Sequence, residues 1–116
     1  MQKLGTEVVR ESYNENFWVD YVNNMVVKVK DDVDFMVIAD RRFPNENIPG
    51  AYCIRVNADL DVRAKRAGYS EDTILEMGKH ESEIHVSKLS VDIDIVNNST
   101  CGDFKNTIES LYELLV

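Results

Sequence analysis

Apolar residues recur at helical spacing near the start of the chain. One run covers residues 2–12 and a second covers residues 17–29, with a stripe formed by Phe17, Tyr21, Met25 and Val29. Apolar side chains at this spacing line one face of an amphipathic helix. Asn14 and Asn16 stand where a helix cap is expected. We therefore predict two packed helices in this part of the chain.

Three short runs have the composition of β-strands. Residues 35–39 are continuously apolar and lie between Asp34 and Asp40. This pattern is typical of a strand that is covered on both faces. Residues 51–56 and 93–96 are two further runs rich in β-forming side chains. We predict that residues 35–39 form the central strand of a parallel sheet.

Helices are predicted between and after the later strands. A polar helix over 59–66 ends at Gly68, a further helix over 70–77 stops at Gly78, and residues 80–83 open a short helical turn. Candidate caps and an apolar stripe indicate a final helix, namely Ser99, Thr100 and Asp103, then Phe104, Ile108, Leu111, Tyr112 and Leu115. Strands that alternate with helices favour an α/β fold, and no linker interrupts the chain. We expect a single domain.

Composition narrows the functions that this domain can have. The chain has 116 residues, of which 21 are acidic and 13 basic, and a formal net charge of -8 at pH 7. An acidic surface repels a phosphate backbone, so extended nucleic-acid binding is disfavoured. Cys53 and Cys101 lack the spacing of a zinc site, and no apolar run is long enough to span a membrane. We expect no metal site of that kind, and a cytoplasmic location.

The end of the predicted strand 35–39 carries the densest group of charges. Asp40, Arg41 and Arg42 would lie in the crevice where open parallel sheets bind ligands. Arginine grips a phosphate through paired donors, and a neighbouring aspartate orients that arginine or holds Mg²⁺ through water. The alternative is a surface salt bridge between Asp40 and Arg42, with Pro44 turning the chain.

Three further clusters have both a chemical and a structural interpretation. Arg63 and Arg66 share a helical face and could cover a phosphate, or simply solvate the helix with Asp59 and Asp61 as partners. The remaining clusters are His80 with Glu81 and Glu83, and Asn97 with Asn98. The first has the residue types of a metal or acid–base site, but its spacing favours a helix start. The second could read a nucleobase, although such residues are commonly turns and caps.

Four stretches together resemble the deoxynucleoside monophosphate kinases of tailed bacteriophages, which belong to the P-loop kinases. They are Leu4-Gly5-Thr6-Glu7 with Arg10, Phe17 and Trp18; Val37 to Glu46; His80 to Glu83; and Asp94 to Ser99. The second stretch is the most specific, and the order of the four covers nearly the whole chain. The resemblance implies a three-layer fold with a short parallel sheet between helices.

The resemblance also implies an activity, the ATP- and Mg²⁺-dependent phosphorylation of a deoxynucleoside 5′-monophosphate. Arg10, Arg42 and Glu46 would then bind the acceptor nucleotide, and Asp40 would act in catalysis at the metal or phosphate end of the strand.

Further roles that the resemblance implies fall in the second half of the chain. Residues about 57–80 would form a lid whose Arg63 and Arg66 act on the phosphates. Asn97 and Asn98 would lie beside the adenine of ATP.

The family's glycine-rich donor-phosphate loop has no counterpart in this sequence. The glycines at positions 5, 50, 68, 78 and 102 never form GxxxxGK. That loop holds the donor phosphates, and the strand before it is central to the sheet. We therefore expect no phosphoryl transfer by this chain alone. We also expect a repair of the sheet, either by pairing of the remaining strands or by a second polypeptide, which is another copy or a partner bearing the P-loop.

A rival hypothesis assigns the chain no catalysis. A small acidic phage protein on this scaffold could bind a nucleotide, or inhibit a host protein through its acidic surface.

Overall fold

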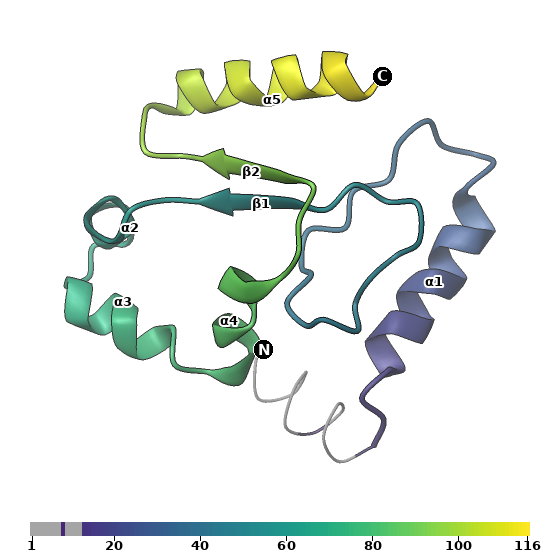
Figure 1. The fold of residues 1–116 in the computed structure, drawn as a ribbon, viewed down its shortest axis with the longest axis horizontal. Helices are drawn as coiled ribbons and strands as arrows, with labels where there is room; N and C mark the ends of the chain where they lie inside the picture. The colour runs from purple at the N-terminus through teal and green to yellow at the C-terminus, as the bar shows by residue number, and fades with distance from the viewer. Residues whose placement is uncertain (1–7, 9–12) are drawn as a thin grey trace. The chain divides into compact units, whose positions relative to one another are not determined.

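The computed structural model describes residue 8 and residues 13–116 and has mixed α/β structure (Figure 1). Its elements, in chain order, are α1 (Phe17–Val29), β1 (Ile54–Asn57), α2 (Leu60–Ala67), α3 (Glu71–Met77), α4 (Glu81–Ile84), the 3₁₀ helix η2 (Val86–Lys88), β2 (Ile93–Val96) and α5 (Cys101–Leu115). The helix predicted over 2–12 lies outside the described residues. Among those that are described, no helix has the length and apolar character needed to cross a membrane.

The chain divides into two compact units. The first unit comprises Met1–Ala51 and Gly78–Ser90, and the second comprises Tyr52–Met77 and Val91–Val116. The single domain over 1–116 and the three-layer arrangement stay predictions.

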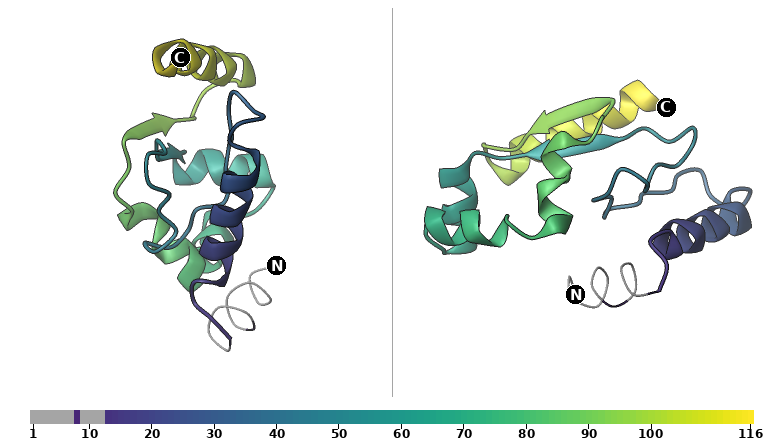
Figure 2. Two further views of the ribbon diagram at one scale, coloured as in Figure 1. Left: turned by 90° about the vertical axis from the view of Figure 1, so that its right-hand side faces the viewer. Right: turned by 60° about the horizontal axis from the view of Figure 1, so that its bottom comes forward.

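The second unit is built on β1 and β2, which pair in parallel (Figures 1 and 2). Ile54 lies opposite Ile93, and the ladder is extended at its end by the Asn97 N–H, which donates to the Asn57 carbonyl at 2.7 Å. The predictions of a parallel sheet and of a strand over 93–96 are confirmed. The strand predicted over 51–56 is shorter and begins later, at Ile54.

The two strands have one apolar and one charged face, because successive side chains point to opposite sides of a sheet. Ile95 is buried, at 6% exposed. The register places Arg55 directly opposite Asp94. Their side chains form two hydrogen bonds, at 2.9 Å from Arg55 Nε and 2.5 Å from Arg55 Nη2. The sheet is therefore joined by side chains as well as by its backbone.

Local signals set the ends of the helices in the second unit. Gly68 ends α2 with φ of 71°, a left-handed conformation that favours glycine. The Thr100 hydroxyl accepts from the Asp103 N–H at the start of α5, and the Asp103 carboxylate accepts from the Thr100 N–H. Such a capping box satisfies amides that a helix start leaves without partners. The predicted helices over 59–66 and 70–77, and the capped final helix, are confirmed.

In the first unit, α1 has the predicted bounds, but its cap differs from the prediction. The Asn16 side chain, at the N-cap position, accepts no hydrogen bond from the first turn of α1. The Asn14 side chain accepts instead from the Asn16 N–H, which precedes the helix, at 2.9 Å. Asn16 Oδ1 instead accepts from Asn45 Nδ2 at 2.8 Å. The start of α1 is thereby linked to a distant part of the sequence.

The prediction of a central strand over 35–39 is wrong. These residues are not part of either strand in the sheet, and Val37 is 87% exposed. Their apolar pattern suits a strand, yet a strand forms only where a neighbour supplies the other half of the ladder. Of the two expected repairs, pairing of the remaining strands is seen for β1 and β2 and leaves 35–39 outside the sheet.

Candidate functional site

Residues 40–46, here called the site loop, are anchored to two other parts of the first unit. Phe43 is buried, at 8% exposed, and its ring lies 5.7 Å from that of His85 between centroids. Asn45 Nδ2 donates to the Glu15 carbonyl at 3.2 Å as well as to Asn16. Burial of one aromatic ring and these hydrogen bonds hold a segment that has no regular secondary structure.

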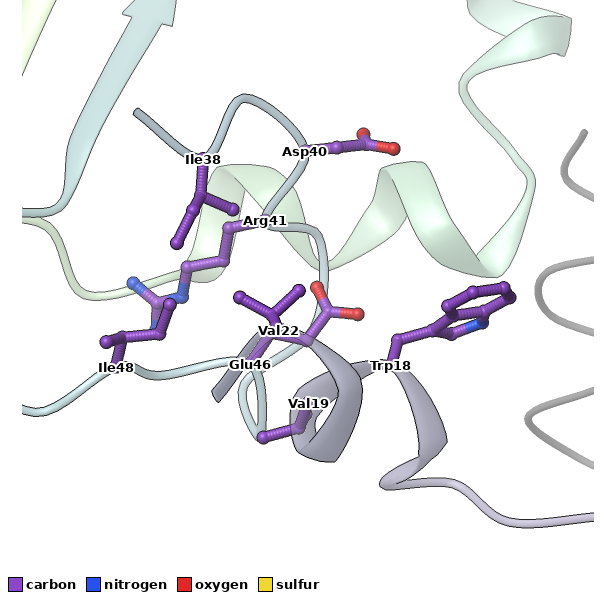
Figure 3. A pocket seen from close by; sticks show the side chains of 8 residues that line it. All are labelled: Trp18, Val19, Val22, Ile38, Asp40, Arg41, Glu46 and Ile48. Atoms are coloured by element: carbon purple, nitrogen blue, oxygen red, sulfur yellow. The ribbon is translucent and has the colours of Figure 1, made fainter. Parts of the chain in front are cut away.

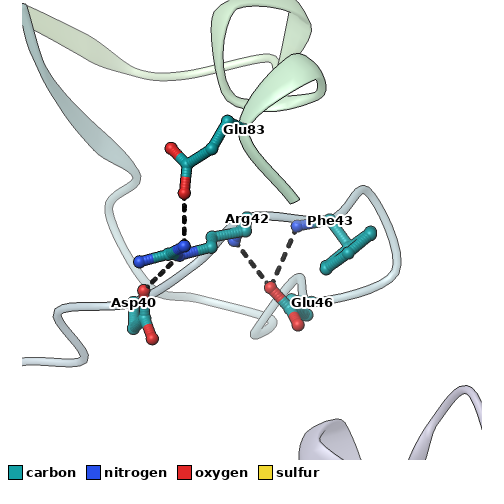
Figure 4. Close-up of polar contacts among 5 residues, drawn as sticks. All are labelled: Asp40, Arg42, Phe43, Glu46 and Glu83. Atoms are coloured by element: carbon teal, nitrogen blue, oxygen red, sulfur yellow. Dashed lines mark hydrogen bonds and ion pairs between the residues drawn. The ribbon is translucent and has the colours of Figure 1, made fainter. Parts of the chain in front are cut away.

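Glu46 shapes the site loop from within. Its Oε2 accepts from the backbone N–H groups of Arg42, at 2.7 Å, and Phe43, at 3.0 Å (Figure 4). The Glu46 N–H donates to the Phe43 carbonyl at 3.1 Å and closes a turn. A carboxylate that accepts two backbone N–H groups fixes the loop conformation. Glu46, predicted to bind substrate, holds the backbone that positions Arg42.

Arg42 lies between two carboxylates. Its Nε donates to Asp40 Oδ1 at 2.6 Å, and its Nη1 donates to Glu83 of α4 (Figure 4). The hydrogen bond that Arg42 donates to Asp40 is the main cause that raises the pKa of Arg42, with the charges of Asp40, Glu83 and Glu46 adding to it. The salt bridge between Asp40 and Arg42, weighed above as the structural alternative, is present.

One guanidinium nitrogen of Arg42, Nη2, remains for a ligand. Within the described part of the chain, Arg42 Nη2 makes no hydrogen bond, and the side chain is 35% exposed. The other two guanidinium nitrogens are held, so the direction of Nη2 is fixed. Arginine held in this way loses little conformational entropy when it binds an anion.

The partnership with Glu83 was not predicted. The sequence identified Glu83 only as part of a cluster with His80, favoured as a helix start, and that short helix is seen as α4. Glu83 is 41 residues from Arg42, so no spacing rule links the two. The only available signal was their opposite charge.

A small open pocket lies beside the site loop. Its volume is about 70 Å³, and its walls are Trp18, Val19 and Val22 of α1, with Ile38, Asp40, Arg41, Glu46 and Ile48 (Figure 3). Arg41 also donates from Nη1 to the Ser90 carbonyl at 3.3 Å. The structure therefore brings Asp40, Arg42 and Glu46 together, and Asp40 and Glu46 also line this largely apolar recess. Arg10, the other predicted substrate-binding residue, lies outside the described residues.

The predicted lid arginines belong to the second unit and differ from each other. Arg66 donates from Nη1 to the Asn97 carbonyl at 2.6 Å and from Nη2 to the Ser99 carbonyl at 2.7 Å. Arg66 therefore holds the turn that follows β2. Arg63 is exposed, and its side chain makes no hydrogen bond or ion pair with any described residue.

The predicted adenine-binding residues hold the backbone together at the carboxyl end of the sheet. Asn98 Oδ1 accepts from the Asp59 N–H at 2.8 Å, and the Asn97 carbonyl is bound by Arg66. The α5 N-terminus carries the Asp103 carboxylate, whose pKa is lowered by hydrogen bonds from Ser99 and Thr100. An internal carboxylate thus stands where a phosphate would bind.

The site loop cluster is rich in carboxylates. No group of three metal-ligating side chains occurs in the part of the chain that is described. In the site loop cluster, carboxylates outnumber guanidiniums three to two, and Asp40 is committed to Arg42. Binding of ATP and Mg²⁺ stays a prediction from the sequence resemblance. No protein-family model matches the chain, and no curated protein or solved structure gives a significant match.

Proposed function

We propose that this chain binds a deoxynucleoside 5′-monophosphate in its first unit, in the manner of a monophosphate kinase's acceptor site. The phosphate is held by Arg42 and the base lies against the pocket beside Trp18. The observation that carries the proposal is the fixed guanidinium of Arg42, in a loop whose Asp40, Arg41 and Glu46 line a largely apolar recess. The nucleotide class itself comes from the sequence resemblance.

The geometry supports binding of the phosphate through a preorganised donor. Asp40 and Glu83 hold two nitrogens of Arg42, so that its Nη2 is presented without further ordering. Charge-assisted hydrogen bonds from a guanidinium to a phosphate are among the stronger ones in proteins. The surrounding carboxylates oppose a dianion, so we expect weak binding that weakens further when the Asp40–Arg42 pair is broken.

The size of the pocket limits which part of the ligand enters it. A volume of about 70 Å³ is below the roughly 300–1,000 Å³ of a site that encloses a whole small molecule. It suits the edge of one base, which packs against the Trp18 ring and the Ile48 side chain. The sugar and phosphate then remain outside the recess, and Arg42 is the proposed contact of the phosphate.

The proposal does not include phosphoryl transfer, because that reaction needs groups that hold the donor phosphates. Positioning and charge stabilisation drive that reaction, and the sequence has no GxxxxGK motif to hold donor phosphates. The proposal is therefore acceptor-nucleotide binding. Turnover would need a donor-phosphate loop from another polypeptide segment.

Trp18 provides the test, because it is the single tryptophan of the chain and lines the pocket. We expect its fluorescence to change saturably on titration with deoxynucleoside monophosphates, and to change less with the matching nucleosides or with inorganic phosphate. Ligand that prefers the folded state also raises the thermal unfolding midpoint.

Two variants sharpen this test. Arg42→Ala should abolish the nucleotide response, and Arg42→Lys should retain only part of it, because lysine keeps the charge and loses the planar fork. Lys28→Ala removes the same charge from an exposed position of α1 and should leave the response intact. If Arg42→Ala binds nucleotide as well as the unaltered chain does, the proposal is wrong.

A further inference from the structure

Residues 36–39 combine an extended apolar sequence with backbone groups that have no partners. Met36, Val37 and Ile38 are 39%, 87% and 40% exposed. No N–H or carbonyl group of residues 36–39 forms a hydrogen bond within the described part of the chain. Regular structure is also absent there.

These features are those of a strand that lacks its neighbour. Valine and isoleucine favour the pleated conformation, and a row of open N–H and carbonyl groups is a template for another strand. Pairing with an added strand would satisfy the backbone groups and cover the Val37 side chain. Several peptide-binding proteins recognise extended peptides by this kind of strand addition.

Charges on both sides of this stretch determine what can pair with it. Asp31, Asp32 and Asp34 precede it; their side chains are exposed and make no ion pair or hydrogen bond with described residues. Asp40 follows it, is 76% exposed at its side chain and is paired with Arg42. The apolar stretch therefore has unpaired carboxylates before it and one carboxylate in an ion pair after it.

These charges disfavour a second copy of the chain as the occupant. An antiparallel pair centred on Val37 places Asp34 opposite Asp40, and a parallel pair in register places each aspartate opposite itself. Like charges directly opposite each other destabilise a pair of strands. A strand with lysine or arginine at its ends meets the same carboxylates with favourable charge.

We infer that residues 36–39 accept a β-strand from a different polypeptide, one with an apolar centre and basic residues at its ends. The inference stands on the open backbone groups and on the flanking aspartates. It does not depend on nucleotide binding.

Two synthetic peptides test the inference with the full chain. Both have alternating valine and threonine in the centre; one has lysines at its ends and the other glutamates. Fluorescence anisotropy of labelled peptide should show at least roughly tenfold tighter binding of the lysine peptide. Amide hydrogen exchange should slow at residues 36–39 when that peptide is bound, because the new ladder protects these groups.

Matched variants separate charge from backbone pairing. Asp31→Asn with Asp32→Asn should weaken binding of the lysine peptide several-fold, whereas Glu109→Gln with Glu113→Gln, which removes the same charge from α5, should not. Val37→Pro should abolish binding, because proline removes the N–H group. Circular dichroism establishes that this variant is folded; if it is not, the aspartate variants and hydrogen exchange decide.

Three results would overturn the inference. The first is equal affinity for the two peptides, and the second is binding without slower exchange at residues 36–39. The third is protection of these amides by the chain alone, rising with concentration as sedimentation shows a dimer. That last result would identify a second copy as the occupant.

Discussion

Residues 35–39 and residues 54–57 are both short runs of strand-forming sequence, yet only the second is a strand. Ile54 faces Ile93 across a parallel ladder, whereas no strand among the described residues pairs with Val37. The apolar pattern alone would rank 35–39 higher, because its run is uninterrupted while 54–57 contains Arg55. The difference shows that a neighbour with open backbone groups, and not hydrophobicity, decides which run forms a sheet.

The two units also differ in the kind of contact that joins distant segments inside each of them. In the second unit, backbone hydrogen bonds between β1 and β2 connect segments distant in the sequence. In the first unit, side chains of the site loop do so, through Arg42 with Glu83 and Asn45 with Asn16. Substitutions in the ladder, in residues 35–39 and in the site loop should therefore differ in their effect on stability.

Removal of a buried side chain from the ladder should have the largest effect. Ile95→Ala loses packing at a site that is 6% exposed and should lower the free energy of unfolding by about 2–4 kcal/mol. Val37→Ala, at 87% exposed, should change it by less than about 0.5 kcal/mol. Urea denaturation followed by circular dichroism measures both. Equal losses would mean that residues 35–39 are packed as the ladder is.

Elements with local signals could be predicted from the sequence, and elements without them could not. The end of α2 follows from Gly68, and the start of α5 follows from Thr100 and Asp103, because these residues act on backbone groups a few positions away. Whether 35–39 is a strand depends on a partner that the local sequence does not contain. The prediction there was wrong for that reason.

In the candidate site too, contacts between neighbouring residues could be predicted and contacts between distant residues could not. The contact of Asp40 with Arg42 joins residues two apart and was weighed from the sequence alone. The contact of Arg42 with Glu83, and that of Arg66 with the Asn97 carbonyl, join residues 41 and 31 apart. Only the fold brings these groups together. The sequence therefore identified Arg42 and Arg66 as candidate site residues but did not determine which groups they contact.

Within the first unit, Glu46→Ala should have the next largest effect. It leaves the backbone N–H groups of Arg42 and Phe43 without their acceptor, which costs about 1–2 kcal/mol in the free energy of unfolding. Glu46→Gln keeps an acceptor oxygen and should cost less. Urea denaturation measures the loss, and hydrogen exchange at those two amides locates it. A larger loss for Glu46→Gln would contradict the role given to Glu46.

The smallest effect is expected from the charged pair across the ladder, and it should depend on pH. The hydrogen bond from Arg55 lowers the pKa of Asp94, so folding favours the ionised carboxylate. The stabilisation is complete above the ordinary aspartate pKa of about 3.9 and is lost as the pH falls through the lower value of the folded chain. Urea midpoints of the unaltered chain between pH 6 and about pH 2 should therefore fall more steeply than those of Asp94→Asn. Glu113→Gln, which removes an exposed charge from α5, controls for net charge and should follow the unaltered chain. Because water screens the exposed Arg55–Asp94 pair, the curves of the unaltered chain and of Asp94→Asn should differ modestly. If these two curves stay parallel throughout, the backbone ladder alone holds β1 to β2.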